Sequence, residues 1–492
     1  MSVTIVETTS HPIRIEWILG CMLGHDPDRT YRAAVIGSGS GGLTVAIGLG
    51  RLGHDTVLVE GGAVGGDCTN TGCIPSKSLL HAAADDLADP FGYTRAKRDD
   101  LAAEEDHEMV DHDRIHLVRG WARLTDRRDP HVLEVSTADG IVEVRAENLV
   151  ISTGSAPAGV EIPGIPPDRI STTDDLFDSP SVPARLVILG GGAIGLEMAT
   201  AFNRLGSEVH VVELREEVLP AMEAEVGSEV RASLQQRDVR FHLGCTIESG
   251  SDEGTSLRLS DGTTISGVDR VLLALGRDPR VDGLGAAQAG VQASPRGIEA
   301  DARGATGVDG IWALGDVTGV THTTQGAGST GRQIVRAIAW PHLPRWGRLP
   351  NIPAAVFTDP PVAAVGLSPA EVASLPEESR RRYGVALPDI DRGYTDDVRS
   401  GFVAVDSERL SGRILRAVVV GPAAAELIGM FTMAIDNRIT LRKLFGMVHP
   451  YPSYADAIGQ IADAYALDVA SDPRGEFAAW RRSRLSRRRS TD

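Results

Sequence analysis

Two cysteines and a lysine lie close together in the first quarter of the sequence. In the segment GGDCTNTGCIPSKSLL, Cys68 and Cys73 are five positions apart, and Lys77 follows four residues later. The chain has only four cysteines, and only three of its 49 basic side chains are lysines. Two thiols in a short ring are easily oxidised and reduced, and a nearby cation stabilises a thiolate. The segment therefore predicts a redox-active dithiol rather than two thiols packed in a core.

The spacing of the two cysteines also constrains the backbone between them. On a straight helix, five residues rise about 7.5 Å, whereas the Cα atoms of a disulfide usually lie about 4.4 to 6.8 Å apart. We therefore expect this segment to be bent, or to lie partly ahead of its helix. Gly72 and Pro75 fit such a bend.

A dinucleotide-binding pattern occurs twice around this chemistry. Each copy has a short apolar strand, a G-x-G-x-x-G turn, and a later strand that ends in glutamate 18 residues after the third glycine. The turns comprise Gly37, Gly39 and Gly42, then Gly190, Gly192 and Gly195; the glutamates are Glu60 and Glu213. Such glycines let the backbone approach a pyrophosphate, and the carboxylate accepts a hydrogen bond from a ribose hydroxyl. The repeat predicts two nucleotide sites.

Later strands extend the repeat. A strand at 149–153 ends at Gly154 and another at 271–275 ends at Gly276, one after each copy. A further strand at 310–314 leads into Gly315 and Asp316. Because ligands bind at the carboxyl ends of strands in open α/β sheets, these positions are candidate cofactor contacts.

The cysteine segment, the two nucleotide folds and the stretch IWALGDV together resemble the FAD-dependent pyridine nucleotide-disulfide oxidoreductases, the family of lipoamide dehydrogenase, glutathione reductase and mercuric reductase. The resemblance covers about residues 32–465. It implies an α/β fold with two Rossmann-like dinucleotide-binding domains and a C-terminal α+β dimerisation domain. The expected parts are an FAD domain at 32–155 and 281–349, an NAD(P) domain at 156–280 and a dimerisation domain at 350–465. Residues 1–31 are unassigned, and 466–492 form a basic tail that we expect to be disordered.

The resemblance also implies roles for individual residues. Cys73 matches the thiolate that contacts the flavin, and Cys68 matches the thiol that attacks substrate. Lys77 matches the lysine beside the flavin, and Glu197 matches its carboxylate partner. The expected FAD contacts are Gly37, Gly39, Gly42, Glu60, Lys77, Ala122, Gly154, Gly315 and Asp316. The expected nicotinamide-nucleotide contacts are Gly190, Gly192, Gly195, Glu213 and Gly276, and no metal site is expected.

The C-terminal motif departs from the family pattern. Many relatives carry His-Pro-Thr-x-x-Glu, whose histidine exchanges protons with the substrate-facing thiol across the dimer interface. Aligning Pro452, Ser453 and Asp456 on this motif puts Tyr451 in place of the histidine, as in mercuric reductase-like members. Aligning His449 instead keeps the histidine but shifts the acid. We favour Tyr451, a poor base because its pKa is near 10, and keep His449 as the alternative.

Charge and composition narrow the range of partners. A net charge of −18 opposes binding to nucleic acid and to anionic lipid. The glycines of the first fingerprint account for the apolar run at 33–50, so we expect no membrane span, and the first 30 residues lack a secretory pattern. We expect a cytoplasmic protein. An arginine cluster between 474 and 489 is the one strongly basic segment.

These observations predict a homodimeric FAD enzyme that passes electrons from NADH through Cys68 and Cys73 to a disulfide, a soft metal or a small oxidised acceptor. The reverse, dihydrolipoamide-type direction is equally open, and the substrate is a small-molecule or protein dithiol or disulfide. NADPH stays open because Arg204 and Arg215 could hold its 2′-phosphate. The alternatives are an NAD(P)H oxidase or transhydrogenase with a regulatory dithiol, and a non-catalytic FAD-binding protein. The connection from Lys77 to Gly120 is shorter than in relatives, so part of a helix beside the dimer interface is expected to be missing.

Overall fold

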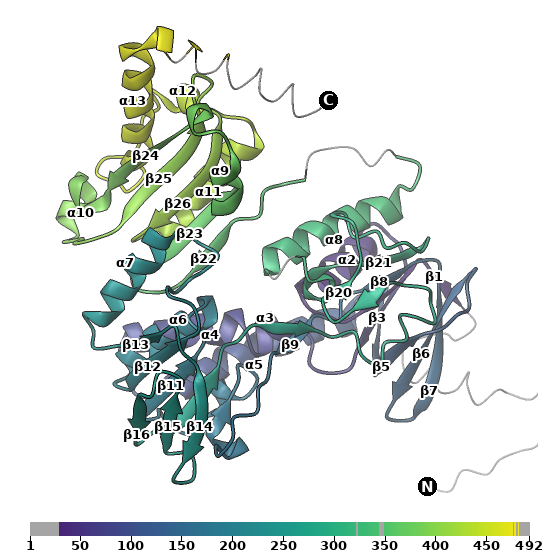
Figure 1. The fold of residues 1–492 in the computed structure, drawn as a ribbon. Coiled ribbons are helices and arrows are strands. Elements are labelled where there is room, and N and C mark those ends of the chain that lie inside the picture. The colour runs from purple at the N-terminus through teal and green to yellow at the C-terminus, as the bar shows by residue number, and fades with distance from the viewer. Residues whose placement is uncertain (1–28, 321–322, 344–348, 476, 479–480, 482–492) are drawn as a thin grey trace, which may run out of the picture. The chain divides into compact units, whose positions relative to one another are not determined.

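The structure is a computed structural model that describes residues 29–320, 323–343, 349–475, 477–478 and 481 (Figure 1). The chain forms two compact units. The first comprises the chain up to Ile74 together with Ala96–Ala156 and Arg277–Gly347; the second comprises Pro75–Arg95, Pro157–Gly276 and the chain from Arg348 onward. Residues 1–28 of the N-terminal extension and 482–492 of the basic tail lie outside the described residues.

A parallel sheet of five strands forms the centre of the first unit, in the order β21-β8-β2-β3-β4. Its strands are β2 (Ala33–Ile36), β3 (Thr56–Glu60), β4 (Ile115–Arg119), β8 (Leu149–Ile151) and β21 (Ile311–Ala313). Helices α2 (Ser40–Arg51) and α8 (Thr324–Ala339) lie side by side against it (Figure 1). A second sheet is built from β1 (Thr30–Tyr31), β5 (Trp121–Leu124), β6 (His131–Thr137) and β7 (Gly140–Ala146).

Alternating side chains explain why this sheet is covered on both faces. In β2, Ala33 and Val35 belong to the core with the helices, whereas Ala34 and Ile36 belong to the core with the second sheet. Successive residues of a strand point to opposite faces. Because both faces are buried, the strand is apolar throughout, as expected for a parallel sheet.

The second unit repeats this three-layer order. Its parallel sheet has the order β10-β17-β11-β12-β13. The strands are β10 (Ile170–Ser171), β11 (Arg185–Leu189), β12 (Glu208–Glu213), β13 (Arg240–Leu243) and β17 (Arg270–Leu273). Helices α6 (Ala193–Arg204) and α7 (Ala224–Gln235) contribute to the core on one face. The small sheet of β14 (Ile247–Ser251), β15 (Ser256–Leu259) and β16 (Thr264–Ser266) covers the other.

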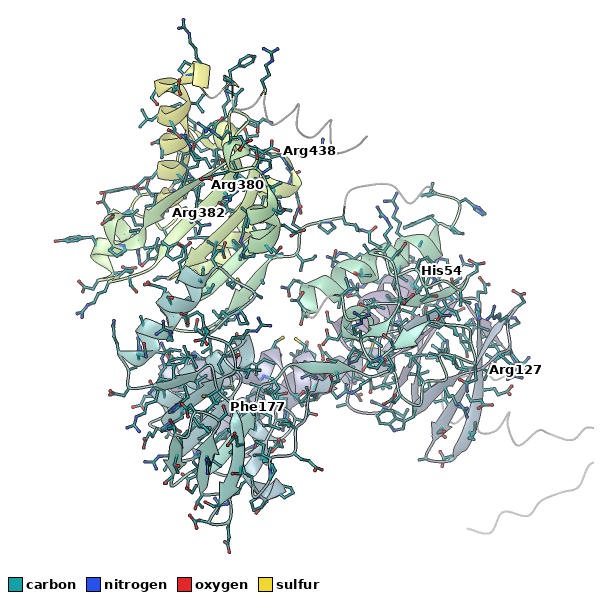
Figure 2. The ribbon with its side chains drawn as sticks, viewed as in Figure 1. His54, Arg127, Phe177, Arg380, Arg382 and Arg438 are labelled. Atoms are coloured by element: carbon teal, nitrogen blue, oxygen red, sulfur yellow. The ribbon has the colours of Figure 1, made fainter. Side chains whose placement is uncertain are left out.

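An antiparallel sheet in the order β22-β23-β26-β25-β24 forms the C-terminal part of the same unit. Its strands are β22 (Ala354–Val356), β23 (Val362–Gly366), β24 (Arg380–Ala386), β25 (Phe402–Glu408) and β26 (Ile414–Val420). Helices α11 (Ala424–Asp436), α12 (Leu441–Leu444) and α13 (Asp456–Ser471) pack on one face. The other face shares a core with α6 and Phe177, and Arg380 and Arg382 lie on β24 (Figure 2).

The remaining elements are short or connect these layers. They are α3 (Gly66–Asn70), α4 (Cys73–Ala84), α5 (Pro90–Asp111), β9 (Ser155–Pro157), β18 (Arg277–Pro279), β19 (Ala293–Ser294), β20 (Gly297–Ile298), α9 (Pro369–Ser374) and α10 (Asp391–Thr395). Within the described ranges, no helix is both long and apolar enough to cross a bilayer. The predicted fold class, two Rossmann-like domains followed by an α+β domain, is confirmed. The expected domain boundaries stay a prediction.

Candidate redox and nucleotide-binding site

The chain bends between the two cysteines, as their spacing requires. Helix α3 ends at Asn70, and α4 begins at Cys73. A Cβ atom at Gly72 would lie 2.7 Å from the carbonyl oxygen of Asp67 and 3.3 Å from the Cα atom of Cys68. Only glycine lets the chain return this close to Cys68. Pro75 falls in the first turn of α4, where its missing N–H breaks no helical hydrogen bond.

The two thiols interact with each other. Neither Cys68 nor Cys73 forms a disulfide in this structure, and both are partly exposed. A hydrogen bond with Cys73 raises the pKa of Cys68 strongly, and burial adds to the effect, while the hydroxyl of Thr324 opposes it. Thr324 Oγ1 also lies 3.4 Å from Cys73 Sγ. Thr324 is not among the predicted site residues, because it is 251 residues from Cys73 in the sequence and no local motif marks it.

Three glycines shape the first nucleotide turn, each for a different reason. Gly37 has φ +96°, and a Cβ atom there would lie 2.4 Å from the Ser152 carbonyl oxygen. A Cβ atom at Gly42 would lie 1.9 Å from the Gly37 carbonyl oxygen. At Gly39 the nearest atom would be 4.0 Å away, so the backbone there faces open space beside the first turn of α2. This arrangement fits a pyrophosphate, which needs close access to backbone N–H groups.

The second turn repeats the first. Gly190 has φ +117°, and a Cβ atom there would lie 2.3 Å from the Ala274 carbonyl oxygen. A Cβ atom at Gly195 would lie 2.0 Å from the Gly190 carbonyl oxygen, whereas at Gly192 it would meet nothing within 4 Å. The second turn therefore fits the same kind of phosphate group. The residues that follow the two later strands, Gly154 and Gly276, also have positive φ.

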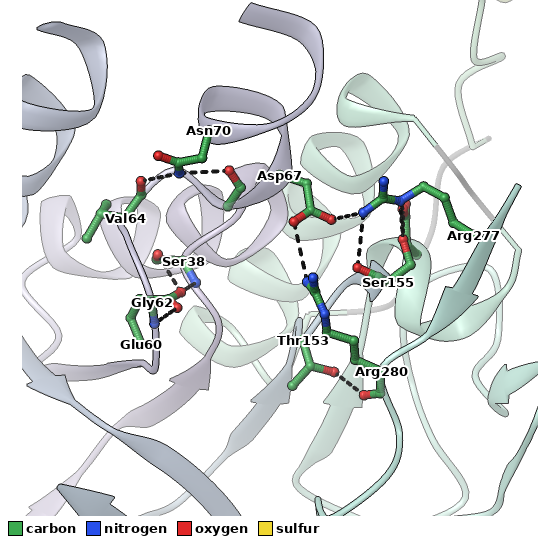
Figure 3. Close-up of polar contacts among 12 residues, drawn as sticks. Ser38, Glu60, Gly62, Val64, Asp67, Asn70, Thr153, Ser155, Arg277 and Arg280 are labelled. Carbon is green, nitrogen blue, oxygen red and sulfur yellow. Dashed lines mark hydrogen bonds and ion pairs between the residues drawn. The ribbon is translucent and has the colours of Figure 1, made fainter. Parts of the chain in front are cut away.

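The two glutamates hold equivalent places. Glu60 accepts hydrogen bonds from the backbone N–H groups of Ser38, at 2.8 Å, and Gly62, at 2.7 Å (Figure 3). Glu213 accepts from the N–H groups of Gly191, at 2.6 Å, and Arg215, at 2.9 Å. A carboxylate has about four lone-pair directions, so each one can still accept from a ribose hydroxyl.

Two further expected FAD contacts lie in the first unit. Asp316 follows Gly315, which has φ +74°, and accepts a 2.6 Å hydrogen bond from the buried hydroxyl of Ser155. Ala122 is on β5, directly after Trp121. Trp121 is 71% exposed, yet a Cβ atom at Gly61, next to Glu60, would lie 2.6 Å from its ring. The indole therefore flanks the loop that follows Glu60.

Lys77 and Glu197 are brought together in the second unit. Lys77 Nζ lies 2.7 Å from Glu197 Oε2, and the other carboxylate oxygen accepts from the N–H of Phe357 at 2.9 Å. The ammonium also lies 4.9 Å from the centroid of the Phe357 ring. Because the Glu197 side chain is only 7% exposed, this pair is held away from water on the carboxylate side.

Tyr451 and His449 have opposite surroundings within the second unit. Tyr451 is 76% exposed, and its hydroxyl donates to Asp391 at 2.8 Å. That hydrogen bond and the charge of Asp391 raise the pKa of Tyr451. The Nε2 atom of His449 is buried without a hydrogen-bond partner among the described residues, near Gly459. Asp456, the expected acid of the motif, accepts from Gln460 at the start of α13.

Known proteins share this arrangement. Residues 31–331 match the family described as pyridine nucleotide-disulphide oxidoreductase, and residues 352–462 match its dimerisation domain. Dihydrolipoyl dehydrogenase 3 from Haloarcula marismortui is 32% identical, with 87% of this chain and 95% of the relative covered. A dihydrolipoyl dehydrogenase from Pseudomonas aeruginosa is 32% identical, with coverage of 87% and 96%.

Two solved structures share the fold. The Cu(II) complex of the HOCl-induced flavoprotein disulfide reductase RclA from Escherichia coli has a TM-score of 0.80 and 27% identity, covering 89% of this chain and 99% of that chain. LpdA from Mycobacterium tuberculosis has a TM-score of 0.79 and 26% identity, covering 88% and 99%.

The match to the dimerisation domain indicates a homodimer. The family uses FAD and NAD(P)H, and both nucleotide turns have the open backbone that these cofactors need. The alternative of a non-catalytic FAD-binding protein is thereby set aside. The chain belongs to the pyridine nucleotide-disulphide oxidoreductase family and is an NAD(P)H-dependent FAD disulfide oxidoreductase.

Proposed function

We propose that Cys68 and Cys73 are the redox-active dithiol of this enzyme and that they pass electrons from NADH to a disulfide, a soft metal or another small oxidised acceptor. The hydrogen bond between the two thiols, across the break between α3 and α4, carries this proposal. Bound FAD supplies the two-electron relay between the nicotinamide and the dithiol. We place the reaction in the cytoplasm, where a dithiol of this kind is kept in its reduced form.

The two cysteines have different tasks. The pKa of Cys68 is raised, so we expect Cys68 to keep its proton in the reduced pair. Cys73 matches the family's flavin-contacting thiolate. When the proton leaves, Cys68 attacks one sulfur of the substrate disulfide, which breaks the substrate S–S bond and releases the first thiol. Cys73 then attacks Cys68, which releases the second thiol and forms the Cys68–Cys73 disulfide. Two electrons have then passed from the dithiol to the substrate.

Lys77 is the cation on the flavin side of this chemistry, as the family pattern implies. Its ammonium has two fixed neighbours, the Glu197 carboxylate and the Phe357 ring. A charge held in this way needs no rearrangement when negative charge develops nearby, which is the basis of electrostatic preorganisation. Glu197 and Phe357 therefore act as positioning residues for Lys77.

The residues proposed to hold FAD are in the first unit, apart from Lys77. They are Gly37, Gly39, Gly42, Glu60, Ala122, Gly154, Gly315 and Asp316. The open backbone at Gly39 and the prearranged carboxylate of Glu60 support this assignment. Gly190, Gly192, Gly195, Glu213 and Gly276 are proposed to hold the nicotinamide nucleotide.

NADH is proposed as the electron donor. Glu213 is held by two N–H groups and would repel a 2′-phosphate. Arg204, one of the two arginines considered for that phosphate, is the last residue of α6 and pairs with Asp359. It lies about 16 Å along the helix from the glycine turn. Only Arg215 remains near Glu213, and its side chain is exposed.

Tyr451 is proposed to take the place of the family's histidine. Its exposed hydroxyl supports this assignment, because a residue that acts across a dimer interface must project from its own subunit. The buried Nε2 atom of His449 argues against the alternative. A tyrosine with a raised pKa is a hydrogen-bond donor at neutral pH and a poor base. We therefore expect slow turnover with ordinary organic disulfides and favour acceptors that need less proton transfer, including soft metal ions.

Anaerobic titration tests this function. The holoenzyme is reduced with NADH or NADPH, and lipoamide, glutathione disulfide or a Cu²⁺ or Hg²⁺ salt is then added. Reoxidation by at least one acceptor in the wild type, lost in Cys68→Ser, supports the proposal. Reduction by NADH followed by reoxidation that Cys68→Ser does not affect would contradict it and favour an oxidase or transhydrogenase.

A further inference from the structure

Asp67, the residue before Cys68, lies between two arginines. One of its carboxylate oxygens accepts from Arg277 Nη2, and the other lies 3.4 Å from Arg280 Nη1 (Figure 3). Both arginines are on or directly after β18, more than 200 residues later in the chain. The first turn of α3 therefore carries a carboxylate that pairs with two arginine side chains.

Arg277 cannot turn its charge toward solvent. Its side chain is 16% exposed, its Nε donates to Ser155 Oγ at 2.8 Å, and its Nη2 donates to the Ser155 carbonyl at 3.1 Å. The same Ser155 hydroxyl donates to Asp316, whose carboxylate is 3.9 Å from Arg277 Nε. Besides its side-chain contact with Asp67, Arg280 is held at its backbone, where its N–H donates to the Gly154 carbonyl and its own carbonyl accepts from the Thr153 hydroxyl. Asp67 thus balances one anchored and one more exposed cation.

The carboxylate at the centre of these charges belongs to Asp67, the residue next to Cys68, and the reactivity of the Cys68 thiol depends on its ionisation. Positive charge near a cysteine stabilises the thiolate and lowers the pKa of the thiol. Two arginines beside α3 would therefore favour ionisation of Cys68. The pKa of Cys68 is instead raised, by the hydrogen bond with Cys73 and by burial. The Asp67 carboxylate contacts both arginines and is the group placed to offset their charge beside Cys68.

The other ionisable groups around α3 do not replace Asp67. Cys73, on α4, forms a hydrogen bond with Cys68. Thr324, on α8, contacts the thiols through an uncharged hydroxyl. Glu105 on α5 contacts α3 through the Thr69 hydroxyl, at 2.9 Å. Burial raises the pKa of Glu105, which favours its uncharged form.

We propose that Asp67 is a positioning residue that keeps the Cys68 thiol neutral in the resting dithiol, by cancelling the charges of Arg277 and Arg280. The inference rests on the proposed function in one respect, that Cys68 is the thiol that attacks substrate. The same hydrogen bonds connect Asp67 on α3, through Arg277 and Ser155, to Asp316. The residue next to Cys68 and one expected cofactor contact therefore belong to one hydrogen-bond network.

Alkylation of Cys68 as a function of pH tests this role. The holoenzyme is reduced anaerobically, treated with iodoacetamide for short times, and analysed by peptide mass spectrometry. Asp67→Asn removes the carboxylate that pairs with both arginines and should lower the apparent pKa of Cys68 by about one unit, which speeds alkylation about tenfold at a fixed pH below that pKa. Arg280→Gln should raise the apparent pKa and slow alkylation. The double variant should return close to wild type.

The shifts in the Cys68 pKa expected for Asp67→Asn and for Arg280→Gln have opposite directions, and this distinguishes an electrostatic role of Asp67 from a structural one. Loosening of α3 would move both single variants in the same direction. Asp278→Asn is the matched control, because it removes one negative charge from β18 at an exposed position between the two arginines. Equal shifts in the control, shifts of one sign, or no shifts would overturn the proposal. If Asp67→Asn does not fold, Arg280→Gln alone still decides, since an unchanged or lowered pKa would contradict the role.

Turnover measurements distinguish a failure of the role proposed for Asp67 from a failure of the function proposed for the dithiol. If Cys68→Ser retains disulfide turnover with NADH, the function assigned to the dithiol fails, whatever the alkylation of the Asp67 variants shows. If Cys68→Ser is inactive but the alkylation shifts are absent, only the role of Asp67 fails.

Discussion

Cys68 and Cys73 form a hydrogen bond with each other, and both contact the hydroxyl of Thr324. Their proposed tasks differ, with Cys73 beside the flavin and Cys68 toward the substrate, so the two single variants should behave differently. Without Cys68, the disulfide of the oxidised enzyme cannot form. Cys73 then stays reduced in the resting enzyme.

We therefore expect the Cys68→Ser holoenzyme to show a long-wavelength thiolate-to-flavin absorption band at rest, and Cys73→Ser to show no such band after two-electron reduction. Absorbance spectra under anaerobic conditions measure both. The matched control is Cys245→Ser, which changes a buried thiol far from the pair in sequence and should leave the wild-type spectrum. Identical spectra in the Cys68 and Cys73 variants would contradict the assignment.

Glu213 is proposed to control the choice between nicotinamide cofactors. Glu213→Ala removes a charge-assisted hydrogen bond to the ribose, worth about 1.5 to 3 kcal/mol. The KM for NADH should rise about 10- to 100-fold, and the preference should shift toward NADPH. Steady-state kinetics with both cofactors provide the measurement.

Glu216→Ala is the control for this change, because Glu216 is an exposed acid in the same loop and lies near Gly244. It should leave the KM for NADH almost unchanged. A wild-type preference for NADPH that Glu213→Ala does not alter would refute the cofactor assignment.

Variants of Tyr451 and His449 should change the rate of disulfide reduction in different ways, depending on which residue takes the place of the family's histidine. If Tyr451 holds the family histidine's place, Tyr451→His should raise the rate of disulfide reduction above wild type, while flavin reduction by NADH stays the same. If His449 is the base, His449→Ala should reduce disulfide turnover about 10²- to 10⁴-fold. Rapid mixing of the prereduced enzyme with lipoamide measures this step, with dimer mass checked in parallel. Equal losses in both variants, together with a weaker dimer, would mean that the two residues only pack the interface.

Helix α7 and strand β26 are joined by a buried ion pair within the second unit. Glu223, the residue before α7, accepts from Arg416 Nη2 at 2.8 Å. Burial raises the pKa of Glu223, but the hydrogen bond and charge of Arg416 outweigh it, so the net shift is downward. Arg416 is itself buried. Breaking one side of such a pair leaves an uncompensated charge.

Glu223→Ala should therefore lower the free energy of unfolding by about 3 kcal/mol at neutral pH. Glu225→Ala, which breaks a more exposed pair with Arg382, should cost about 1 kcal/mol or less. The contribution of Glu223 is fully present above its unfolded pKa of about 4.3 and is lost as the pH falls through its lower folded pKa. Urea unfolding at pH 7 and near pH 3 should show the difference between wild type and Glu223→Ala shrinking in acid. A constant difference would contradict the pKa shift.

The dimer of the whole protein requires a surface that one subunit cannot cover. Exposed apolar side chains gather in the C-terminal part, where Val448 is 94% exposed, and Met433, Phe445 and Met447 are also exposed. Apolar surface of this kind marks interaction sites. Tyr451 lies in the same stretch of chain.

We expect Val448→Glu to raise the dimer dissociation constant about 100-fold or more, because a charge would be placed in a desolvated interface. Light scattering over a range of concentrations measures this change. Ile141→Glu changes an equally apolar, exposed residue on β7 of the first unit and should leave the dimer intact. A dimer that Val448→Glu does not weaken would place the interface elsewhere.

Local features could be predicted from the sequence because their physics acts over short distances along the chain. A G-x-G-x-x-G turn needs positive φ and close backbone contacts within six residues, and strand, helix and strand lengths fix the spacing to Glu60 and Glu213. The bend between Cys68 and Cys73 follows from the geometry of a disulfide. The alternation in β2 and β11 also follows from sequence, since buried parallel strands must be apolar on both faces.

Other features were decided only by the tertiary structure. Thr324 meets Cys73, and Arg277 meets Asp67, across more than 200 residues of sequence. The choice between Tyr451 and His449 could not be made from a motif that both residues partly fit. The packing of α13 gives the two residues different surroundings, because it buries one nitrogen of His449 near Gly459 and leaves Tyr451 exposed beside Asp391. Such contacts depend on how separately formed elements pack, and neither periodicity nor spacing along the chain carries that information.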